Sequence, residues 1–181
     1  MVRTSVLSKL PMAHTGPHER FALHFEFTAQ INGSPDTIFD LLADMPNYGR
    51  WLPGSSAYGG TVNVTPYPVR LGTTYLDAGP VEKPGEVTEF ARPHRIGFHH
   101  VVQIRRPFAT DVDARVRYTL EPKDGGTFVT RDLDLGMDLR GLLMLARPLL
   151  VVAFRRENSR TLACLKAFVE RASAVTDRGT A

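Results

Sequence analysis

The clearest feature of the chain is a regular alternation of apolar and other residues that begins near Arg20. Apolar side chains occupy every second position from Phe21 to Ile31, and mostly polar side chains lie between them. A two-residue period predicts a strand with one buried face and one solvated face. Asn32-Gly33 is a turn signal, so we place the end of this strand at Ile31.

Strand-like runs recur six more times along the middle of the chain, separated by turns rich in glycine and proline. They cover residues 58–65, 73–77, 86–91, 95–104, 111–121 and 127–137. Consecutive strands joined by short polar turns form antiparallel sheets. The alternation further indicates that one face of this sheet is covered and the other is solvated.

Two short helices are predicted directly after the first strand. Ser34 is a favourable N-cap and Pro35 suits the first helical position, so a helix begins here and ends before Pro46. A second helical turn is expected at 46–52, before the Pro53-Gly54 stop signal.

The longest helix is predicted from Leu149 to Ala172. Its apolar residues recur with the 3.6-residue period of an amphipathic helix, and Asn158 is a polar residue on that inner line. A shorter helix is expected before it at 142–147, ended by Pro148. A sheet closed by one long helix has two layers that can enclose a small molecule. We therefore predict an α+β fold with a ligand cavity between the sheet and the helix.

The length of 181 residues suits one domain with short tails. We assign residues 20–173 to the domain, residues 1–19 to an N-terminal arm and residues 174–181 to a polar C-terminal tail. Cys164 is the only cysteine, so no intramolecular disulfide forms, and a cytoplasmic location is the simplest expectation. The arm lacks the apolar core of a secretory signal peptide.

Several classes of function have no signature in the sequence. The net charge is +3 and the basic residues are dispersed, so nucleic acid is not an expected partner. No nucleotide-binding, metal-ligand or nucleophile motif is present, and we expect no metal and no other cofactor. The apolar stretch 142–154, followed by Arg155-Arg156, suits contact with a membrane surface or a protein partner. Packing over the open end of the sheet is the interpretation that we favour for this stretch.

Several short motifs follow one another in an order that resembles a known family. They are Asn32-Gly33-Ser34-Pro35, Met45-Pro46-Asn47-Tyr48, Leu71-Gly72-Thr73, Gly85-Glu86-Val87, Pro93-His94-Arg95-Ile96 and Arg156-Glu157-Asn158. Together they resemble the polyketide cyclase/dehydrase branch of the START-like superfamily, also called SRPBCC proteins. The resemblance covers roughly residues 20 to 172.

The resemblance implies a helix-grip fold, with two short helices after the first strand. In this fold a curved seven-stranded antiparallel sheet wraps around a long C-terminal helix. Members of the superfamily bind lipids, sterols, polyketides or other apolar molecules in the cavity between sheet and helix. Some are aromatase/cyclases, and many are described as ligand carriers. The branch has no invariant catalytic motif, so the resemblance transfers no catalytic residue to this chain.

Strand parity identifies side chains that face such a cavity. His100 is the one polar residue on the apolar face of its strand, and Arg131 lies among apolar neighbours on another. Tyr118 also faces inward. The predicted ligand-binding residues are Trp51, Tyr75, Phe98, His100, Val116, Tyr118, Arg131, Phe154 and Asn158.

The candidate catalytic residues are His100, Arg131 and Tyr118. Histidine titrates near neutral pH, so His100 suits a general acid or base. A buried Arg131 needs a carboxylate, a water-filled cavity or an anionic ligand group. Tyr118 and Tyr75 could donate hydrogen bonds to a ligand carbonyl or enolate. Each of these side chains is also compatible with a purely structural role in the core.

Three functions are consistent with these observations. The leading hypothesis is a protein that binds a hydrophobic small molecule, lipid-like or polyketide-like, as a carrier or a sequestering protein. The second is an aromatase/cyclase or dehydrase that acts on a polyketide-like substrate by acid–base and positional catalysis. The third is a module that docks on a membrane surface or a protein partner.

Overall fold

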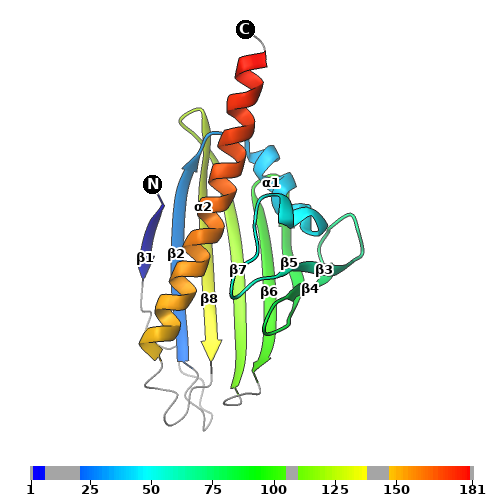
Figure 1. Cartoon of the computed structure of the whole chain (residues 1–181), viewed down its shortest axis with the longest axis vertical. Helices are drawn as coiled ribbons and strands as arrows, with labels where there is room; N and C mark the ends of the chain where they lie inside the picture. Colours follow the sequence, from blue (N-terminus) through cyan, green and yellow to red (C-terminus); the bar gives the residue numbers. More distant parts are fainter. Residues whose placement is uncertain (1, 7–20, 105–109, 138–146, 180–181) are drawn as a thin grey trace.

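The computed structural model describes residues 2–6, 21–104, 110–137 and 147–179. One antiparallel sheet and one long helix dominate the fold (Figure 1). The sheet has eight strands in the order β1-β2-β8-β7-β6-β5-β4-β3. The strands are β1 (Arg3–Val6), β2 (Phe21–Ile31), β3 (Gly60–Thr65), β4 (Thr74–Ala78), β5 (Lys83–Ala91), β6 (Arg95–Ile104), β7 (Thr110–Lys123) and β8 (Gly126–Met137).

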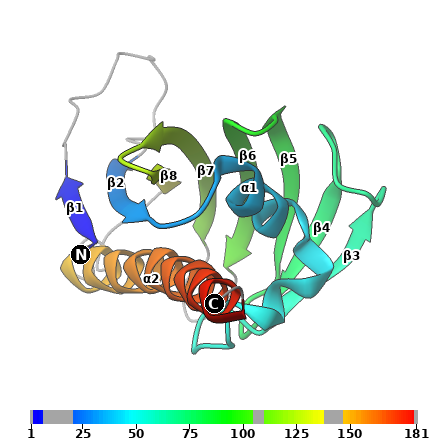
Figure 2. The same ribbon diagram turned by 90° about the horizontal axis from the view of Figure 1, so that it is seen from above.

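The sheet is a meander with one long-range pairing. Strands β3 to β8 are hydrogen-bonded in chain order, and β8 then pairs with β2 along the whole length of β2. Seen from above, the strands follow an arc, and α2 (Arg147–Gly179) lies across its open side (Figure 2). This arrangement confirms the predicted α+β helix-grip fold, and β2 to β8 correspond to the seven predicted strands.

The sheet contains one strand more than predicted. Strand β1 pairs antiparallel with β2, from Arg3 opposite Thr28 to Val6 opposite Phe25. It lies in the segment that the sequence assigned to the N-terminal arm. Its four residues are too few to show an alternating pattern. The strand forms because the outer edge of β2 offers unpaired backbone hydrogen-bonding groups.

Both short helices follow β2 as predicted. Helix α1 (Pro35–Ala43) begins after Ser34, whose hydroxyl oxygen accepts a hydrogen bond from the Thr37 backbone N–H at 3.2 Å. The second is a 3-10 helix, η1 (Met45–Arg50), which begins one residue earlier than expected. It is followed by Trp51, which is buried in the core.

The C-terminal helix α2 is longer than predicted at both ends. Pro148 lies in its first turn, where a proline breaks no intrahelical hydrogen bond. It therefore stands at the start of the long helix and does not separate two helices. Residues 142–146 of the predicted shorter helix lie outside the described residues. At its other end, α2 continues beyond Ala172 into the segment assigned to the polar tail.

The apolar stretch at the start of α2 is only partly buried. Leu149 and Val152 are exposed, whereas Leu150, Val151 and Phe154 pack partly against the core. One side of the described part of this stretch therefore packs against the core. In the described part of the chain, no helix combines the length and the apolar character needed to cross a membrane.

Contacts with the turn after β2 fix the position of α2. The Asn32 backbone N–H donates to the Glu170 carboxylate at 3.2 Å, and the Ser173 hydroxyl donates to the Asn32 carbonyl at 3.1 Å. A Cβ atom at Gly33 would lie 2.4 Å from Val169 Cγ1, so the absence of a side chain allows this close approach. These hydrogen bonds and this close packing fix the turn against α2, and they thereby position the helix over the sheet.

Candidate functional site

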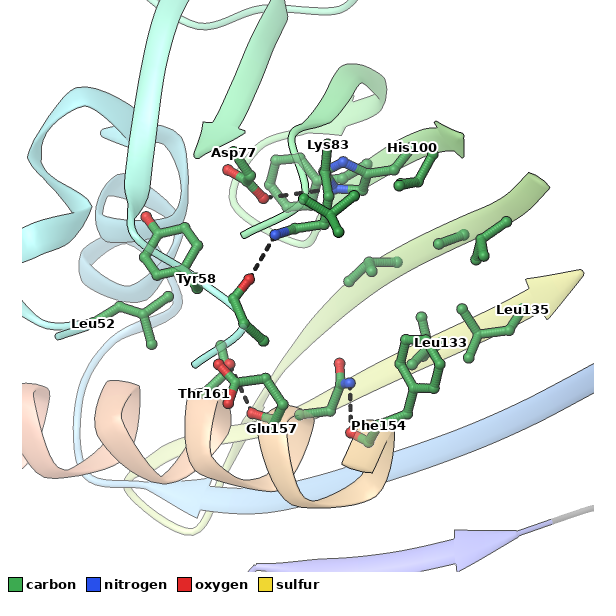
Figure 3. Close-up of a pocket in the computed structure, with 18 of the residues that line it drawn as sticks. Leu52, Tyr58, Asp77, Lys83, His100, Leu133, Leu135, Phe154, Glu157 and Thr161 are labelled. Carbon is green, nitrogen blue, oxygen red and sulfur yellow. Dashed lines mark hydrogen bonds and ion pairs between the residues drawn. The ribbon is translucent and has the colours of Figure 1, made fainter. Parts of the chain in front are cut away.

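A cavity of about 460 Å³ lies between the curved sheet and α2 (Figure 3). Its wall is formed by β4 to β8 and α2, together with η1 and the segments that follow η1 and precede β5. Most of the wall is apolar, and the volume falls in the range of small-molecule binding sites. Packing voids in a close-packed core are much smaller, so the space suits a ligand.

All nine residues that the sequence assigned to the ligand site lie on this wall. They are Trp51, Tyr75, Phe98, His100, Val116, Tyr118, Arg131, Phe154 and Asn158. Strand pairing brings several of them together. His100 lies opposite Ala114, and Phe98 lies opposite Val116, in the β6–β7 pair. Contact of these residues with a ligand remains a prediction.

Arg131 is the centre of one polar group on the wall. Its Nε donates a hydrogen bond to the Tyr118 hydroxyl at 2.6 Å, and its Nη1 donates to the side-chain carbonyl of Asn158. Strand pairing places Tyr118 directly opposite Arg131, and α2 supplies Asn158. The guanidinium carbon also lies 5.2 Å from the centre of the Tyr118 ring, in a cation–π contact. Three elements thus converge on one buried cation.

A second polar group surrounds His100 on β6. The Tyr75 hydroxyl lies 3.0 Å from His100 Nε2, and Asp77 Oδ2 lies 4.0 Å from the same nitrogen (Figure 3). The Thr61 hydroxyl donates to Asp77 Oδ1 at 2.6 Å. Because that bond uses the only proton of this hydroxyl, Thr61 accepts from the Tyr58 hydroxyl at 3.0 Å. A chain of hydrogen bonds therefore runs from Tyr58 to Asp77.

Burial shifts the pKa values of the polar residues around His100. It lowers the pKa of His100 from its ordinary value, and the Asp77 carboxylate opposes this shift by favouring the imidazolium. Burial likewise raises the pKa of Asp77, and His100 opposes that shift. Burial also raises the pKa of Tyr75 well above its ordinary value, so its hydroxyl keeps its proton. The neutral forms of His100 and Tyr75 therefore predominate near neutral pH.

Several polar residues on the wall were missing from the sequence prediction, among them Tyr58, Asp77, Lys83 and Glu157. Asp77 was detectable, because it shares strand parity with Tyr75 in a predicted strand. Lys83 was not detectable, because it precedes the strand expected at 86–91 and strand parity therefore did not apply to it. Only the tertiary structure places it on the cavity wall. Its ammonium group donates to the Ala57 carbonyl at 2.7 Å (Figure 3).

One buried nitrogen atom of a wall residue, Nε1 of Trp51, has no hydrogen-bond partner within the described part of the chain. The Trp51 ring packs edge-to-face against Tyr48, with the ring centres 5.0 Å apart, and this contact does not satisfy its N–H. A buried polar atom without a partner costs about 1–3 kcal/mol.

The described residues contain no group of three or more histidine, cysteine, aspartate or glutamate side chains that could hold a metal ion. The neighbouring His99 and His100 point to opposite faces of β6. His99 Nε2 lies 3.2 Å from Asp113 Oδ1 on the outer face, whereas His100 lines the cavity. These two rings therefore cannot bind one ion together.

Residues 22–170 match the protein family described as polyketide cyclase/dehydrase and lipid transport. The match covers most of the chain, including every strand of the cavity wall and the α2 residues on it. A comparison with curated protein sequences gave no match.

Solved structures share the fold at low sequence identity. The Mll3558 protein of Rhizobium loti is 21% identical, with a TM-score of 0.60 over 83% of this chain and 99% of that chain. CalU16 of Micromonospora echinospora is 14% identical, with a TM-score of 0.55 over 99% and 92%. The di-domain ARO/CYC BexL from the BE-7585A biosynthetic pathway is 14% identical, with a TM-score of 0.61 over 82% and 50%. At such identities the similarity extends to the fold alone.

Proposed function

Since this chain belongs to the polyketide cyclase/dehydrase and lipid transport family, we propose that it binds a hydrophobic small molecule between the sheet and α2. In this proposal the protein carries or sequesters a lipid-like or polyketide-like ligand. The observation that carries the proposal is the mostly apolar cavity of about 460 Å³. Burial of apolar ligand surface there would supply most of the binding energy, and the few polar groups would orient the ligand.

Titration with N-phenyl-1-naphthylamine tests this proposal, because the fluorescence of this neutral dye rises in apolar surroundings. We expect a saturable rise with one dye molecule per protein molecule, and competition by lipid-like or polyketide-like compounds. Native mass spectrometry of the protein purified from its own host would then identify a ligand that co-purifies. A fluorescence signal that stays flat, or that never saturates, would contradict the proposal.

Acid–base catalysis is a second candidate function, favoured by the contact between Tyr75 and His100 on the cavity wall. A neutral imidazole can remove a proton from the carbon beside a ketone, and a tyrosine hydroxyl can stabilise the enolate oxygen that forms. Asp77 would stabilise the resulting imidazolium, because its carboxylate lies 4.0 Å from the ring. These steps occur in the cyclisation and dehydration of polyketide-like substrates.

Hydrogen–deuterium exchange of 2-tetralone, followed by NMR, tests this second function. Because burial lowers the pKa of His100, we expect the exchange rate to be constant above about pH 6.5 and to fall in more acidic solution. His100→Gln should slow the exchange by roughly 100-fold. The matched control is His99→Gln, since His99 lies on the outer face. Equal exchange rates in the two variants would show that His100 is not the catalytic base.

A further inference from the structure

Arg131 is a buried cation on the wall of an apolar cavity. The residue is 8% exposed, and an arginine side chain keeps its positive charge in proteins. Its hydrogen-bond partners, Tyr118 and Asn158, are both uncharged. None of the carboxylates in the described part of the chain forms an ion pair with it. A buried charge without a counter-charge is costly, so this arrangement calls for an explanation.

Other charged groups on the wall do have neighbours of opposite charge. Glu157, a wall residue, forms an ion pair with Arg160 and accepts a hydrogen bond from its Nη2 at 2.7 Å. The carboxylates of Asp77 and Glu157 both favour the charged form of Lys83, against the burial that lowers its pKa. Among the charged groups that the structure describes on the wall, Arg131 therefore differs in having no neighbour of opposite charge.

The Arg131 guanidinium also has N–H donors that form no hydrogen bond with the described residues. It carries five N–H groups in a planar fork, and two of them serve the bonds to Tyr118 and Asn158. No hydrogen bond joins the remaining donors to any residue that the structure describes. Since Arg131 lines the cavity, these donors are available to a ligand. The fork matches the spacing of two oxygen atoms on one anionic group.

Neighbouring side chains hold this guanidinium in place before any ligand arrives. The Asn158 amide nitrogen donates to the Phe154 carbonyl at 2.7 Å (Figure 3), which directs the amide oxygen toward Arg131. Tyr118 also holds the guanidinium, through the hydrogen bond that Nε donates to its hydroxyl and through the cation–π contact with its ring. An anionic ligand group would therefore meet donors that are already oriented, and its binding would cost little conformational entropy.

We propose that the ligand of this cavity is an apolar acid, whose anionic oxygen atoms accept hydrogen bonds from Arg131 while its apolar body fills the remaining space. This inference rests on the proposed function and specifies the class of ligand. A carboxylate presents two oxygen atoms to the fork, whereas an ionised enol or phenol presents one; all three place an oxyanion on an apolar skeleton. Tyr118 and Asn158 serve as positioning residues that orient the guanidinium.

A matched pair of dyes tests the proposal. The dye 8-anilinonaphthalene-1-sulfonate has the aromatic skeleton of N-phenyl-1-naphthylamine and differs from it by one sulfonate group. The measured quantity is the ratio of the affinity for the anionic dye to the affinity for the neutral dye. In Arg131→Met, which keeps an apolar stem and loses the charge, we expect this ratio to fall by about tenfold or more.

A second variant tests the same idea with less change of volume. Asn158→Asp is nearly isosteric and supplies a carboxylate to Arg131 from within the protein, so it should also lower the ratio by about tenfold. It keeps the test decisive if circular dichroism shows that Arg131→Met does not fold. Arg115→Met is the matched control, because this arginine has a side chain 68% exposed on the outer face of β7. Its ratio should equal that of the wild type.

An unchanged ratio in both Arg131→Met and Asn158→Asp would overturn the proposal. A loss of the preference for the anionic dye in Lys83→Met alone would also overturn it, since the anion would then bind beside Lys83. Both outcomes leave binding of the neutral dye intact, so they concern the acidic group and not the cavity. A wild-type protein that binds neither dye would instead overturn the proposed function, and this inference with it.

Discussion

Replacing Ala114 with tryptophan should reduce the affinity for N-phenyl-1-naphthylamine by roughly 30-fold or more. Ala114 lies on β7 opposite His100, and its methyl group lines the cavity. An indole ring at this point would enter the space that the dye needs. Because the ring would occupy open volume, we expect no displacement of buried side chains and a folded variant.

The dye titration described above provides the measurement, and thermal unfolding followed by circular dichroism checks the fold. Ala163→Trp is the matched control, because Ala163 lies on the exposed side of α2 and is not part of the cavity wall. It should bind the dye as the wild type does. If folded Ala114→Trp keeps wild-type affinity, the dye binds elsewhere, and the proposed function loses its main support.

Replacing Leu165 with alanine should lower the free energy of unfolding by about 2–5 kcal/mol. Leu165 is fully buried, together with Leu162 and Val169, on the face of α2 that packs against the sheet. The change removes apolar contacts and leaves a void that the packed sheet cannot fill by small movements. Domains of this size are stable by only about 5–15 kcal/mol, so the expected loss is a large part of the total.

Leu149→Ala is the matched control for this experiment. It removes the same atoms from the same helix, but Leu149 is 75% exposed, so we expect a change of about 0.5 kcal/mol or less. Urea unfolding at neutral pH measures both variants. If the two variants lost similar amounts of stability, the packing of α2 on the sheet would not depend on Leu165 in the way described here.

Inward-facing strand residues of the cavity wall were predictable because strand parity is a local property. In β8, Arg131 shares its face with Leu133 and Leu135, and all three are buried. In β6, His100 shares its face with Phe98 in the same way. Successive side chains of a strand point to opposite faces, so this prediction needs no knowledge of distant parts of the chain.

The partners of these residues were not predictable by the same reasoning. Asn158 reaches Arg131 from a helix 27 positions along the chain, and Tyr75 reaches His100 from another strand. Such contacts depend on the register of the sheet and on the position of α2 above it. Strand β1 was missed for a related reason, because it is held by pairing with β2 and shows no pattern of its own.

By itself, the sequence determined the order of the strands and helices from β2 onward, the apolar face of these strands and hence the α+β class. These properties follow from the spacing of side chains along the chain and from local turn and cap residues. Only the tertiary structure decided how much space remains between sheet and helix, and which polar groups meet there. It also decided that Arg131 meets uncharged partners and that burial shifts the pKa of His100. Cavity volume, counter-charge and desolvation all depend on sheet curvature and on contacts between distant segments, which no local pattern records.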